Sequence, residues 1–504
     1  MNKNEFCSLQ MKILIICVFH LFVLVHCSLP SKSSEPPLLL LISFDGFRWD
    51  YPDIYNLTNF HSLKSRGVHV KYVENQFSTI TFPMHFSIVT GLYEETHGIV
   101  ANSMFDRKLN ASASFNGLND TRWWYVFSHQ SFERIINLLL FLRSQNPYTQ
   151  PIWISNQLAN DSTNRRSGVI AWPGSEVVIN GNRPIKHQAY NGSRLFDSVL
   201  KQIFDWFLEP IETRINLGVI YHYQPDVTGH KYGPISPEMN QTVHECDAYI
   251  VQLLQIIDRN EYLKENLNVI ITADHGMTQT DRNHQIILAD YVNTNLFSAY
   301  GSRALVNIFV HSQSDIDSIY KNLSKIEHYQ VYKKADIPSE YHYQNNIRIG
   351  GKKKSHLNNS LCLFIRIDIL FFGQLGYEII IPGDNASIEI HGDHGYDNRE
   401  SSMHPIFYAF GPSFRQNYLG EPFLSLDIYP LMLHLLNLNP RQTNGSFDRV
   451  KQLLRHERRF FAISTINLCS FMLLSLTLVL VIVHLFNKKQ ELNKVPFLKK
   501  NYLL

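Results

Sequence analysis

Three apolar runs that end next to acidic and histidine residues constrain the fold of this chain most strongly. The runs are Leu38–Phe44, Leu217–Tyr223 and Leu267–Thr272. The residues that follow them closely are Asp45, then Asp226 and His230, then Asp274 and His275. Short, β-rich apolar runs indicate buried parallel strands, whose carboxyl ends meet at one edge of a sheet. We therefore predict that these five side chains lie close together.

Two further residues complete the predicted set. His394 lies in the segment HGDHGYDN, and Thr81 lies in TITFPMH. Each Asp/His pair alone is a weak signal, but several buried carboxylates without a cation would be very costly. Carboxylates and imidazoles together suit a pair of borderline divalent cations, zinc above all. The pattern favours a two-metal site for phosphoryl transfer.

Thr81 is the candidate nucleophile of that site. Pro83 stands near the first position of a predicted helix that runs through Val89, where its missing N–H costs nothing. A hydroxyl at a helix N-terminus faces free N–H groups and the positive end of the dipole, where an anion is stabilised. A bound cation would lower the pKa of the alcohol and supply an alkoxide. The alternative is a simple capping threonine.

Both ends of the chain suggest processing and membrane insertion. Met11–Cys27 carries a lysine near its start and continues as an apolar stretch, which predicts a signal peptide over 1–28 or an uncleaved anchor. The segment 461–486 holds no Asp, Glu, Lys or Arg in 26 residues, more than the roughly 20 that a membrane-spanning helix needs. We therefore expect a C-terminal transmembrane helix, a cytoplasmic tail at 487–504, and a single-pass type I protein of the plasma membrane with an extracellular catalytic domain.

Glycosylation sequons agree with that expected topology, because all of them precede 461–486. They are Asn56, Asn110, Asn119, Asn160, Asn191, Asn240, Asn322, Asn358, Asn385 and Asn444. A net charge of +2 is too small to indicate a nucleic-acid partner. The pattern says nothing about oligomeric state.

The region between the two ends indicates one domain. Helical periodicity occurs at Leu195–Trp206, Val243–Ile257 and Ser314–Ile326, while Leu305–Val310 and Pro151–Ser155 look like strands. Alternating strands and helices favour one α/β domain over 36–445, with a mostly parallel sheet flanked by helices.

Two segments interrupt this alternation, at 125–143 and 351–367. One interpretation is a pair of surface loops. The other is retained introns, because Trp-Tyr-Val and Gly-Lys-Lys at their starts can be encoded by strings that look like splice donors.

Five segments carry a resemblance to a known family. They are DGFRWDY (45–51), TFPMHFSIVTGLYEETHGIVANSM (81–104), PDVTGHKYGP (225–234), ADHGM (273–277) and HGDHGYDN (391–398). In this order they resemble the ectonucleotide pyrophosphatase/phosphodiesterase family, which belongs to the alkaline phosphatase superfamily. The chain is most similar to its single-domain type I members, the fourth and fifth. The resemblance implies an alkaline-phosphatase-like α/β fold.

The same resemblance implies a role for each matching residue. One zinc would be held by Asp226, His230 and His394, and the other by Asp45, Asp274 and His275 together with Thr81. Thr81 would form a nucleotidyl-threonine intermediate, and Asn102 would donate its amide to the phosphoryl oxygens. Phe82 and Tyr190 would sandwich a flat group such as a nucleobase, with Tyr221 near the phosphate. Trp172 would line the pocket or belong to the core.

Two departures from the family pattern bear on the substrate. Met84 stands where the family usually has asparagine, and Ile80 replaces a common lysine, which removes a positive charge near the substrate. The leading hypothesis is a cell-surface enzyme that hydrolyses extracellular nucleotides or dinucleotides to nucleoside 5′-monophosphates. A choline-phosphodiester or lysophospholipid hydrolase, and a catalytically silent adhesion or receptor domain, are the alternatives.

Overall fold

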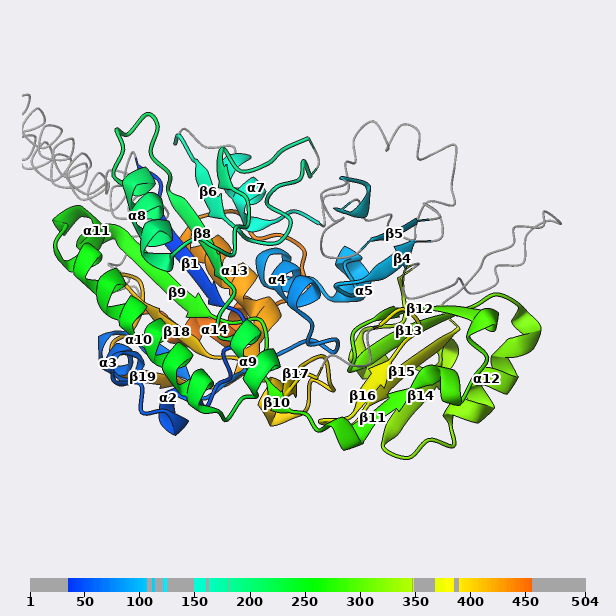
Figure 1. Cartoon of the computed structure of the whole chain (residues 1–504). Coiled ribbons are helices and arrows are strands. Elements are labelled where there is room, and N and C mark those ends of the chain that lie inside the picture. The colour runs from blue at the N-terminus through cyan, green and yellow to red at the C-terminus, as the bar shows by residue number, and fades with distance from the viewer. Residues whose placement is uncertain are drawn as a thin grey trace, which may run out of the picture. The chain divides into compact units, whose positions relative to one another are not determined.

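The computed structural model describes residues 35–106, 111–113, 121–124, 149–159, 163–179, 181–346, 348, 368–384 and 389–455. These residues form an eight-stranded sheet, a smaller four-stranded sheet and the helices that cover them (Figure 1). Several expected features lie outside the described residues: the signal peptide at 1–28, the segments 125–143 and 351–367, the apolar segment 461–486 and the tail at 487–504.

The large sheet is mostly parallel, as predicted. Its strands in spatial order are β19 (Tyr418–Gly420), β2 (Val68–Val70), β18 (Phe407–Phe410), β9 (Leu267–Thr272), β1 (Leu38–Phe44), β8 (Leu217–His222), β6 (Ser167–Ile170) and β7 (Lys186–Gln188). β1 runs parallel to both of its neighbours, β8 and β9. Only β18 pairs in the antiparallel sense, with β9 and with β2. The three predicted strands β1, β8 and β9 are therefore adjacent at the centre of the sheet.

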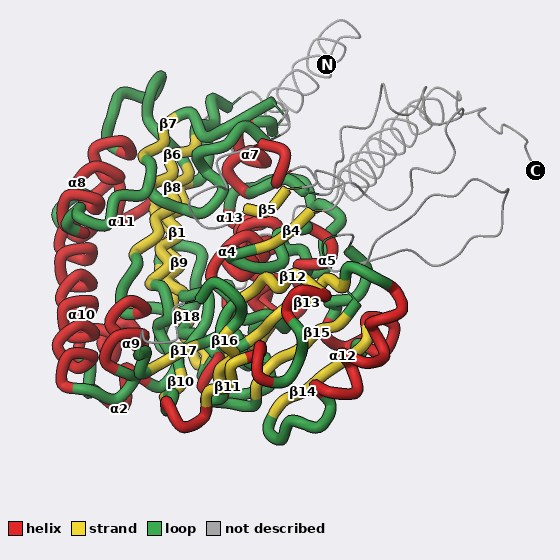
Figure 2. Tube along the Cα trace, turned by 45° about the vertical axis from the view of Figure 1, so that its right-hand side comes forward, coloured by secondary structure: helices red, strands yellow, loops and turns green. Residues whose placement is uncertain are grey.

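Helices cover both faces of this sheet (Figure 2). On one face lie α8 (Phe196–Phe207) and α10 (Pro237–Asp258), and on the other lie α4 (Thr81–Thr90), α7 (Ile152–Gln157) and α13 (Ile428–Leu435). Side chains of β1 alternate between the two cores: Leu38 and Leu40 pack with the first pair of helices, whereas Leu39 and Leu41 pack with the second group. Burial on both faces explains why β1 is continuously apolar.

The smaller sheet is antiparallel throughout. Its strands in order are β12 (Phe297–Gly301), β13 (Leu305–Val310), β15 (Ile369–Gly373) and β14 (Tyr329–Lys333). The helix α12 (Ile316–Leu323) buries Ile316, Ile319 and Leu323 in a separate core with these strands. Sequence periodicity predicted β13 and α12 correctly, but it could not predict which strands pair with β13.

Short ladders and helices complete the described residues. The two-stranded ladders are β10 (Thr278–Gln279) with β17 (Gly392–Asp393), β11 (Gln285–Ile287) with β16 (Glu378–Ile380), β20 (Phe423–Leu424) with β3 (Val73–Glu74), and β4 (Met104–Asp106) with β5 (Ala111–Ala113). The remaining helices are α2 (Tyr51–Ile54), α3 (Thr58–Arg66), α5 (Glu94–His97), α9 (Asp226–Tyr232), α11 (Glu261–Asn266) and α14 (Phe447–Val450).

One secondary-structure prediction is wrong. The run Pro151–Ser155 looks like a strand in the sequence, but the structure has a helix there, α7, which Pro151 precedes as N-cap. Five apolar residues are too few to separate a buried strand from a buried helix by periodicity. The helices predicted at 195–206 and 243–257 are confirmed as α8 and α10.

The expected C-terminal transmembrane helix, and the type I plasma-membrane location that depended on it, are corrected. Among the described residues no helix is both long and apolar enough to cross a membrane. The longest, α10, has 22 residues but carries acidic side chains at Glu238, Glu245, Asp247 and Asp258. The segment 461–486 lies outside the described residues. The fold class of the described residues is therefore α/β, and no membrane-spanning helix is among them.

Truncation of a central strand residue tests this packing. Leu41 is fully buried in β1, and Leu41→Ala should lower the free energy of unfolding by about 2–5 kcal/mol, because it removes buried apolar contacts and leaves a cavity. Leu419→Ala in β19 is the matched control: its side chain is 61% exposed, and the change should stay within about 0.5 kcal/mol. Chemical denaturation followed by tryptophan fluorescence measures both. An equal loss of unfolding free energy in the two variants would contradict the placement of Leu41 in the core and of Leu419 at the surface.

Candidate active site

Three aspartates converge at the carboxyl edge of the large sheet. Asp45 follows β1, Asp226 is the first residue of α9, and Asp274 lies two residues after β9. The Asp226 N–H donates to the Asp45 carbonyl (3.0 Å), and the Gly46 N–H donates to Asp274 Oδ1 (3.1 Å). Gly46 has φ +68°, and a Cβ there would lie 3.0 Å from Asp226 Cα. A side chain at position 46 would therefore push the aspartates apart.

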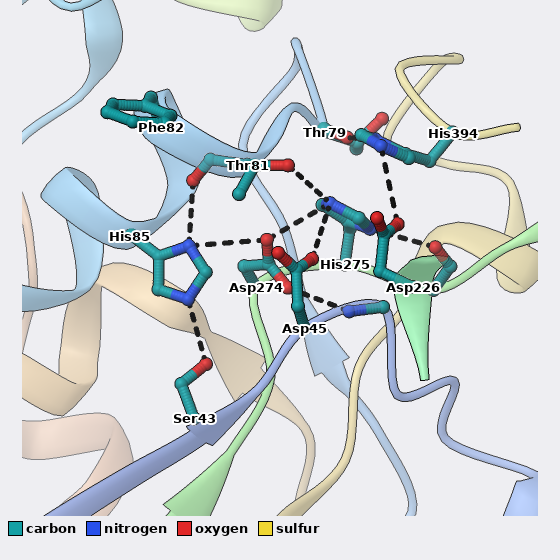
Figure 3. A network of polar contacts seen from close by, with 12 residues as sticks. Ser43, Asp45, Thr79, Thr81, Phe82, His85, Asp226, Asp274, His275 and His394 are labelled. Atoms are coloured by element: carbon teal, nitrogen blue, oxygen red, sulfur yellow. Dashed lines mark hydrogen bonds and ion pairs between the residues drawn. The ribbon is translucent and has the colours of Figure 1, made fainter. Parts of the chain in front are cut away.

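The first predicted ligand group, Asp45, Asp274 and His275, is assembled in the structure (Figure 3). His275 Nε2 lies 3.0 Å from Asp274 Oδ2 and 3.4 Å from Asp45 Oδ1. Gly276 follows directly, and a Cβ there would lie 2.1 Å from the Ser402 carbonyl oxygen. Gly276 is therefore needed for close backbone packing at this turn.

The second group gathers around Asp226. Its Oδ1 lies 3.4 Å from His230 Nε2 and 3.6 Å from His394 Nε2. Asp226 and His230 are one turn apart on α9, while pairing of β10 with β17 brings His394 to the same place. Asp226 also has ligand atoms within 4.8 Å of those of His275 and His394, so the two groups adjoin.

The three imidazoles share one hydrogen-bonding arrangement. Nδ1 lies 2.9 Å from a backbone carbonyl in each case: Gly392 for His230, Gly276 for His275 and Thr79 for His394. A carbonyl only accepts, so each Nδ1 carries the hydrogen, and a ring in its neutral form presents Nε2 as a lone pair. This is the tautomer and orientation that a metal-ligating histidine needs.

The carboxylates supply a direct test of whether the residues fit a cation. Asp45 Oδ1, Asp226 Oδ1 and Asp274 Oδ2 are buried, and none has a hydrogen-bond partner among the described residues. Buried carboxylate oxygens without partners are strongly destabilising unless a positive charge compensates them. Unpartnered oxygens beside Nε2 lone pairs form a donor set that fits divalent cations.

The surroundings shift the pKa values of Asp45 and Asp274, the two carboxyls of the first group, in opposite directions. Burial, together with the charges of Asp274 and Asp226, raises the pKa of Asp45 well above its ordinary value. Burial would also raise the pKa of Asp274, but neighbouring imidazoles, first His275, outweigh it and hold that pKa well below its usual range. Burial and the nearby imidazoles lower the pKa of His394. The protein alone leaves one carboxyl poorly stabilised as an anion.

Thr81 begins the helix that points toward the two groups. It is the first residue of α4, after the extended Ile80, and its Oγ1 lies 3.3 Å from His275 Nε2. The Phe82 N–H donates to Asn102 Oδ1 (2.9 Å), which orients the Asn102 amide at this helix end. Pro83 occupies the third helical position, still within the first turn, where no intrahelical donor is needed.

The predicted substrate residues do not share one environment. Tyr190 is 46% exposed, and its ring centroid lies 5.9 Å from that of Tyr221. The Tyr221 hydroxyl donates to Asp45 Oδ2 (2.6 Å), so this residue orients a carboxylate. The ring of Phe82 projects away from the carboxylates (Figure 3). Trp172 is 1% exposed and its Nε1 donates to the His85 carbonyl (3.3 Å), which favours the core alternative.

The sequence prediction missed supporting residues around these groups. Asp393 Oδ1 accepts from the His394 N–H (2.8 Å), and the Thr79 carbonyl accepts from His394. His85, which contacts both Thr81 and Asp274, was also missed. Only His85 had a sequence signal: it lies four residues after Thr81, and therefore on the same face of the predicted helix.

The loop before Thr81 is held by a buried acid. Both the N–H and the hydroxyl of Ser78 donate to Glu94 Oε1, at 3.3 and 2.9 Å. Burial raises the pKa of Glu94 to about 7. The next residue, Thr79, has φ +36°, an uncommon conformation for a β-branched residue. This loop therefore depends on contacts with its surroundings.

Comparisons with known proteins find a family and several relatives similar to this chain. The profile of the type I phosphodiesterase / nucleotide pyrophosphatase family matches residues 39–397. The chain is 36% identical to human ectonucleotide pyrophosphatase/phosphodiesterase family member 5 over 86% of this chain and 82% of that protein. It is also 36% identical to human bis(5′-adenosyl)-triphosphatase ENPP4, over 88% and 87% of the two chains.

A solved structure is similar along most of the chain. Murine family member 5, in an inactive threonine-to-alanine variant in complex with AMP, superposes with a TM-score of 0.71 at 35% identity. The match covers 84% of this chain and all of that one. The resemblance drawn from the five sequence segments is thereby confirmed.

The buried Glu94 predicts a pH-dependent difference in stability. Its folded pKa, about 7, lies above the value near 4.5 expected when unfolded. The stability that the parent protein gains from protonated Glu94 is therefore fully present below pH 4.5, and it is lost as the pH rises through 7. Relative to the parent, Glu94→Gln should become more stable by about 1.4 kcal/mol per pH unit between pH 5 and 7, then level off. Chemical denaturation at several pH values measures the free energy of unfolding of both proteins. If the two free energies change in parallel with pH, the prediction is contradicted.

Proposed function

This chain belongs to the type I phosphodiesterase / nucleotide pyrophosphatase family, and we propose that it is a two-zinc hydrolase that uses Thr81 as its nucleophile. Its proposed substrates are nucleotides or dinucleotides, from which it releases nucleoside 5′-monophosphates. The observation that carries this proposal is the contact of Thr81, at the start of α4, with the buried group of Asp45, Asp274 and His275. The proposed catalytic domain spans 36–445.

Two sets of residues would hold the cations. One set is Asp226, His230 and His394, and the other is Asp45, Asp274 and His275 together with Thr81. When bound, zinc would neutralise the buried carboxylates, attract the phosphate and lower the pKa of the threonine hydroxyl. The unpartnered oxygens of Asp45, Asp226 and Asp274 support this assignment.

The proposed reaction has two displacements at phosphorus. Thr81 Oγ1 loses its proton and bonds to phosphorus, while the bond from phosphorus to the leaving oxygen breaks. A water oxygen then bonds to the phosphorus of the nucleotidyl-threonine while the bond from phosphorus to Thr81 Oγ1 breaks, and a proton from that water restores the threonine hydroxyl. The Asn102 amide, held through its oxygen by the Phe82 N–H, would donate to the phosphoryl oxygens as negative charge develops.

Nucleotides are the favoured substrate class for two reasons. One relative is named a bis(5′-adenosyl)-triphosphatase, and the structure of another contains AMP. In this chain Tyr190 is accessible, and together with Phe82 it would flank a flat base. The Tyr190 ring adjoins Tyr221, which itself contacts Asp45, so a base stacked there would place its phosphate toward the carboxylate groups.

Replacement of the nucleophile tests the mechanism. Thr81→Ala should lower kcat for thymidine 5′-monophosphate p-nitrophenyl ester on the order of 10³-fold or more, because no other group can form the covalent bond. Thr81→Ser should keep measurable activity, since it retains the hydroxyl. Release of p-nitrophenol measures both, and the exposed Thr58→Ala serves as a control. Retention of activity by Thr81→Ala would disprove the threonine mechanism.

Removal of metal tests the cofactor. Treatment with EDTA should abolish hydrolysis and lower the melting temperature, because the carboxylates lose their compensating charge. The loss is about 2.7 kcal/mol when free zinc had been at 100 times its dissociation constant. Added Zn²⁺ should restore both. A folded, zinc-loaded parent without activity would favour the silent binding domain that the sequence leaves open.

A further inference from the structure

His85 occupies a central place that the proposed mechanism does not use. It is fully buried, one turn after Thr81 on α4. Its Nδ1 lies 2.9 Å from the Thr81 carbonyl oxygen and 3.3 Å from Asp274 Oδ2, while Nε2 lies 3.0 Å from Ser43 Oγ (Figure 3). One ring therefore contacts the candidate nucleophile residue, a candidate metal ligand and the central strand β1.

The partners determine where the hydrogen sits. A carbonyl oxygen and a carboxylate oxygen only accept, so Nδ1 must carry the hydrogen that faces them. In the neutral ring Nε2 is then an acceptor, and the Ser43 hydroxyl donates to it. That N–H donates to the Thr81 carbonyl, and Nδ1 also lies 3.3 Å from Asp274 Oδ2 without a hydrogen bond to it.

Aromatic packing holds the ring in this orientation. Trp172 and Tyr221 both contact it edge to face, with centroids 4.9 and 5.0 Å away. Trp172 also donates to the His85 carbonyl. Rotation of the imidazole about χ2 would break both polar contacts and collide with packed rings. The position of Nδ1 is therefore well defined.

Asp274 depends on few neighbours for its own orientation. The Gly46 N–H donates to Oδ1, while Oδ2 has no hydrogen-bond partner in the described part of the chain and lies near the two imidazoles of His275 and His85. If His275 ligates a cation, its Nε2 is committed to that cation. His85 is then the neighbour that remains to direct Oδ2 from the protein side.

We propose that His85 is a positioning residue: its Nδ1–H donates to the Thr81 carbonyl, and the same edge of the ring lies against Asp274 Oδ2, so that a candidate metal ligand and the candidate nucleophile keep one mutual geometry. This inference rests on the proposed function for the identity of the nucleophile and the cation. Its effect on Zn²⁺ binding, however, can be measured without any activity.

Two amide substitutions distinguish the contacts of the two ring nitrogen atoms, Nδ1 and Nε2. The amide nitrogen of His85→Asn comes near the place of Nδ1, whereas that of His85→Gln comes near the place of Nε2. Asparagine should keep the N–H that the Thr81 carbonyl accepts beside Asp274, and glutamine should keep only the contact with Ser43. Ser43→Ala removes the far contact alone. The three variants therefore distinguish a role of the Nδ1–H group of His85 from simple packing of its ring.

Zn²⁺ affinity is the primary measurement, made on the purified full chain by competition with a chromogenic chelator. His85→Gln should weaken Zn²⁺ binding about 10- to 100-fold, as loss of a contact that orients a ligand does. His85→Asn should recover most of that affinity, and Ser43→Ala should stay within about threefold of the parent. In the hydrolysis assay His85→Gln should lower kcat more than it changes KM.

Several results would overturn the proposal. Equal affinities of the asparagine and glutamine variants for Zn²⁺ would assign the ring to packing, as would variants that melt earlier yet bind Zn²⁺ like the parent. Failure of both the asparagine and the glutamine variant to fold would also assign the ring to packing. If only glutamine fails to fold, parental affinity in the asparagine variant supports the proposal and reduced affinity overturns it.

The proposed function can fail separately. A parent that binds Zn²⁺ but does not hydrolyse the ester disproves the enzyme assignment, while a selective loss of affinity in His85→Gln still supports the role of His85 toward Asp274. A parent that binds no Zn²⁺ overturns both.

Discussion

Repulsion among three buried carboxylates is the constraint around which this site is built. Asp45, Asp226 and Asp274 each carry an oxygen without a hydrogen-bond partner among the described residues. A fold that brings such groups together at one sheet edge requires compensation, and the adjacent imidazoles supply only part of it. The raised pKa of Asp45 beside the lowered pKa of Asp274 shows that this compensation is unequal.

The sheet brings the ligands together, but loops orient them. Parallel pairing of β1 with β8 and β9 places the three aspartates at one edge. Orientation of the imidazoles depends on backbone carbonyls outside the large sheet, at Thr79, Gly276 and Gly392. Gly392 can play this part because it packs against α9: a Cβ there would lie 2.5 Å from the Gly229 carbonyl oxygen. The glycines therefore contribute through close backbone approach.

Sequence reasoning was most successful where one physical rule dominates. β1 and β9 were predicted to the residue, because a strand buried on both faces must be apolar along its whole length. α7 was predicted wrongly, because a short apolar run satisfies helix and strand equally. The expected membrane helix rested on apolar length alone, and no helix of the described ranges has the properties to support it.

Residues that act through geometry were harder to foresee than ligands. Asp and His after apolar runs are visible in a sequence, whereas the ring of Tyr221 gives no sign that its hydroxyl will reach Asp45. Trp172 looked equally suited to a pocket or a core, and only its burial decides between them. His85 stood inside the most informative segment, yet its neighbours Ser43, in β1, and Asp274, just after β9, are far away in the sequence.

The contacts of residues 79–81 connect the candidate metal ligands with the proposed nucleophile, Thr81. His394 donates to the Thr79 carbonyl, His275 contacts Thr81 Oγ1, and His85 donates to the Thr81 carbonyl. Two of these three imidazoles belong to the candidate ligand sets, and the third adjoins Asp274. A shift of either ligand set would therefore move the backbone that carries the hydroxyl. Because small misplacement of reacting atoms costs large factors in rate, the same hydrogen bonds that would prepare the imidazoles for a cation would also preorganise Thr81, the proposed nucleophile, for attack.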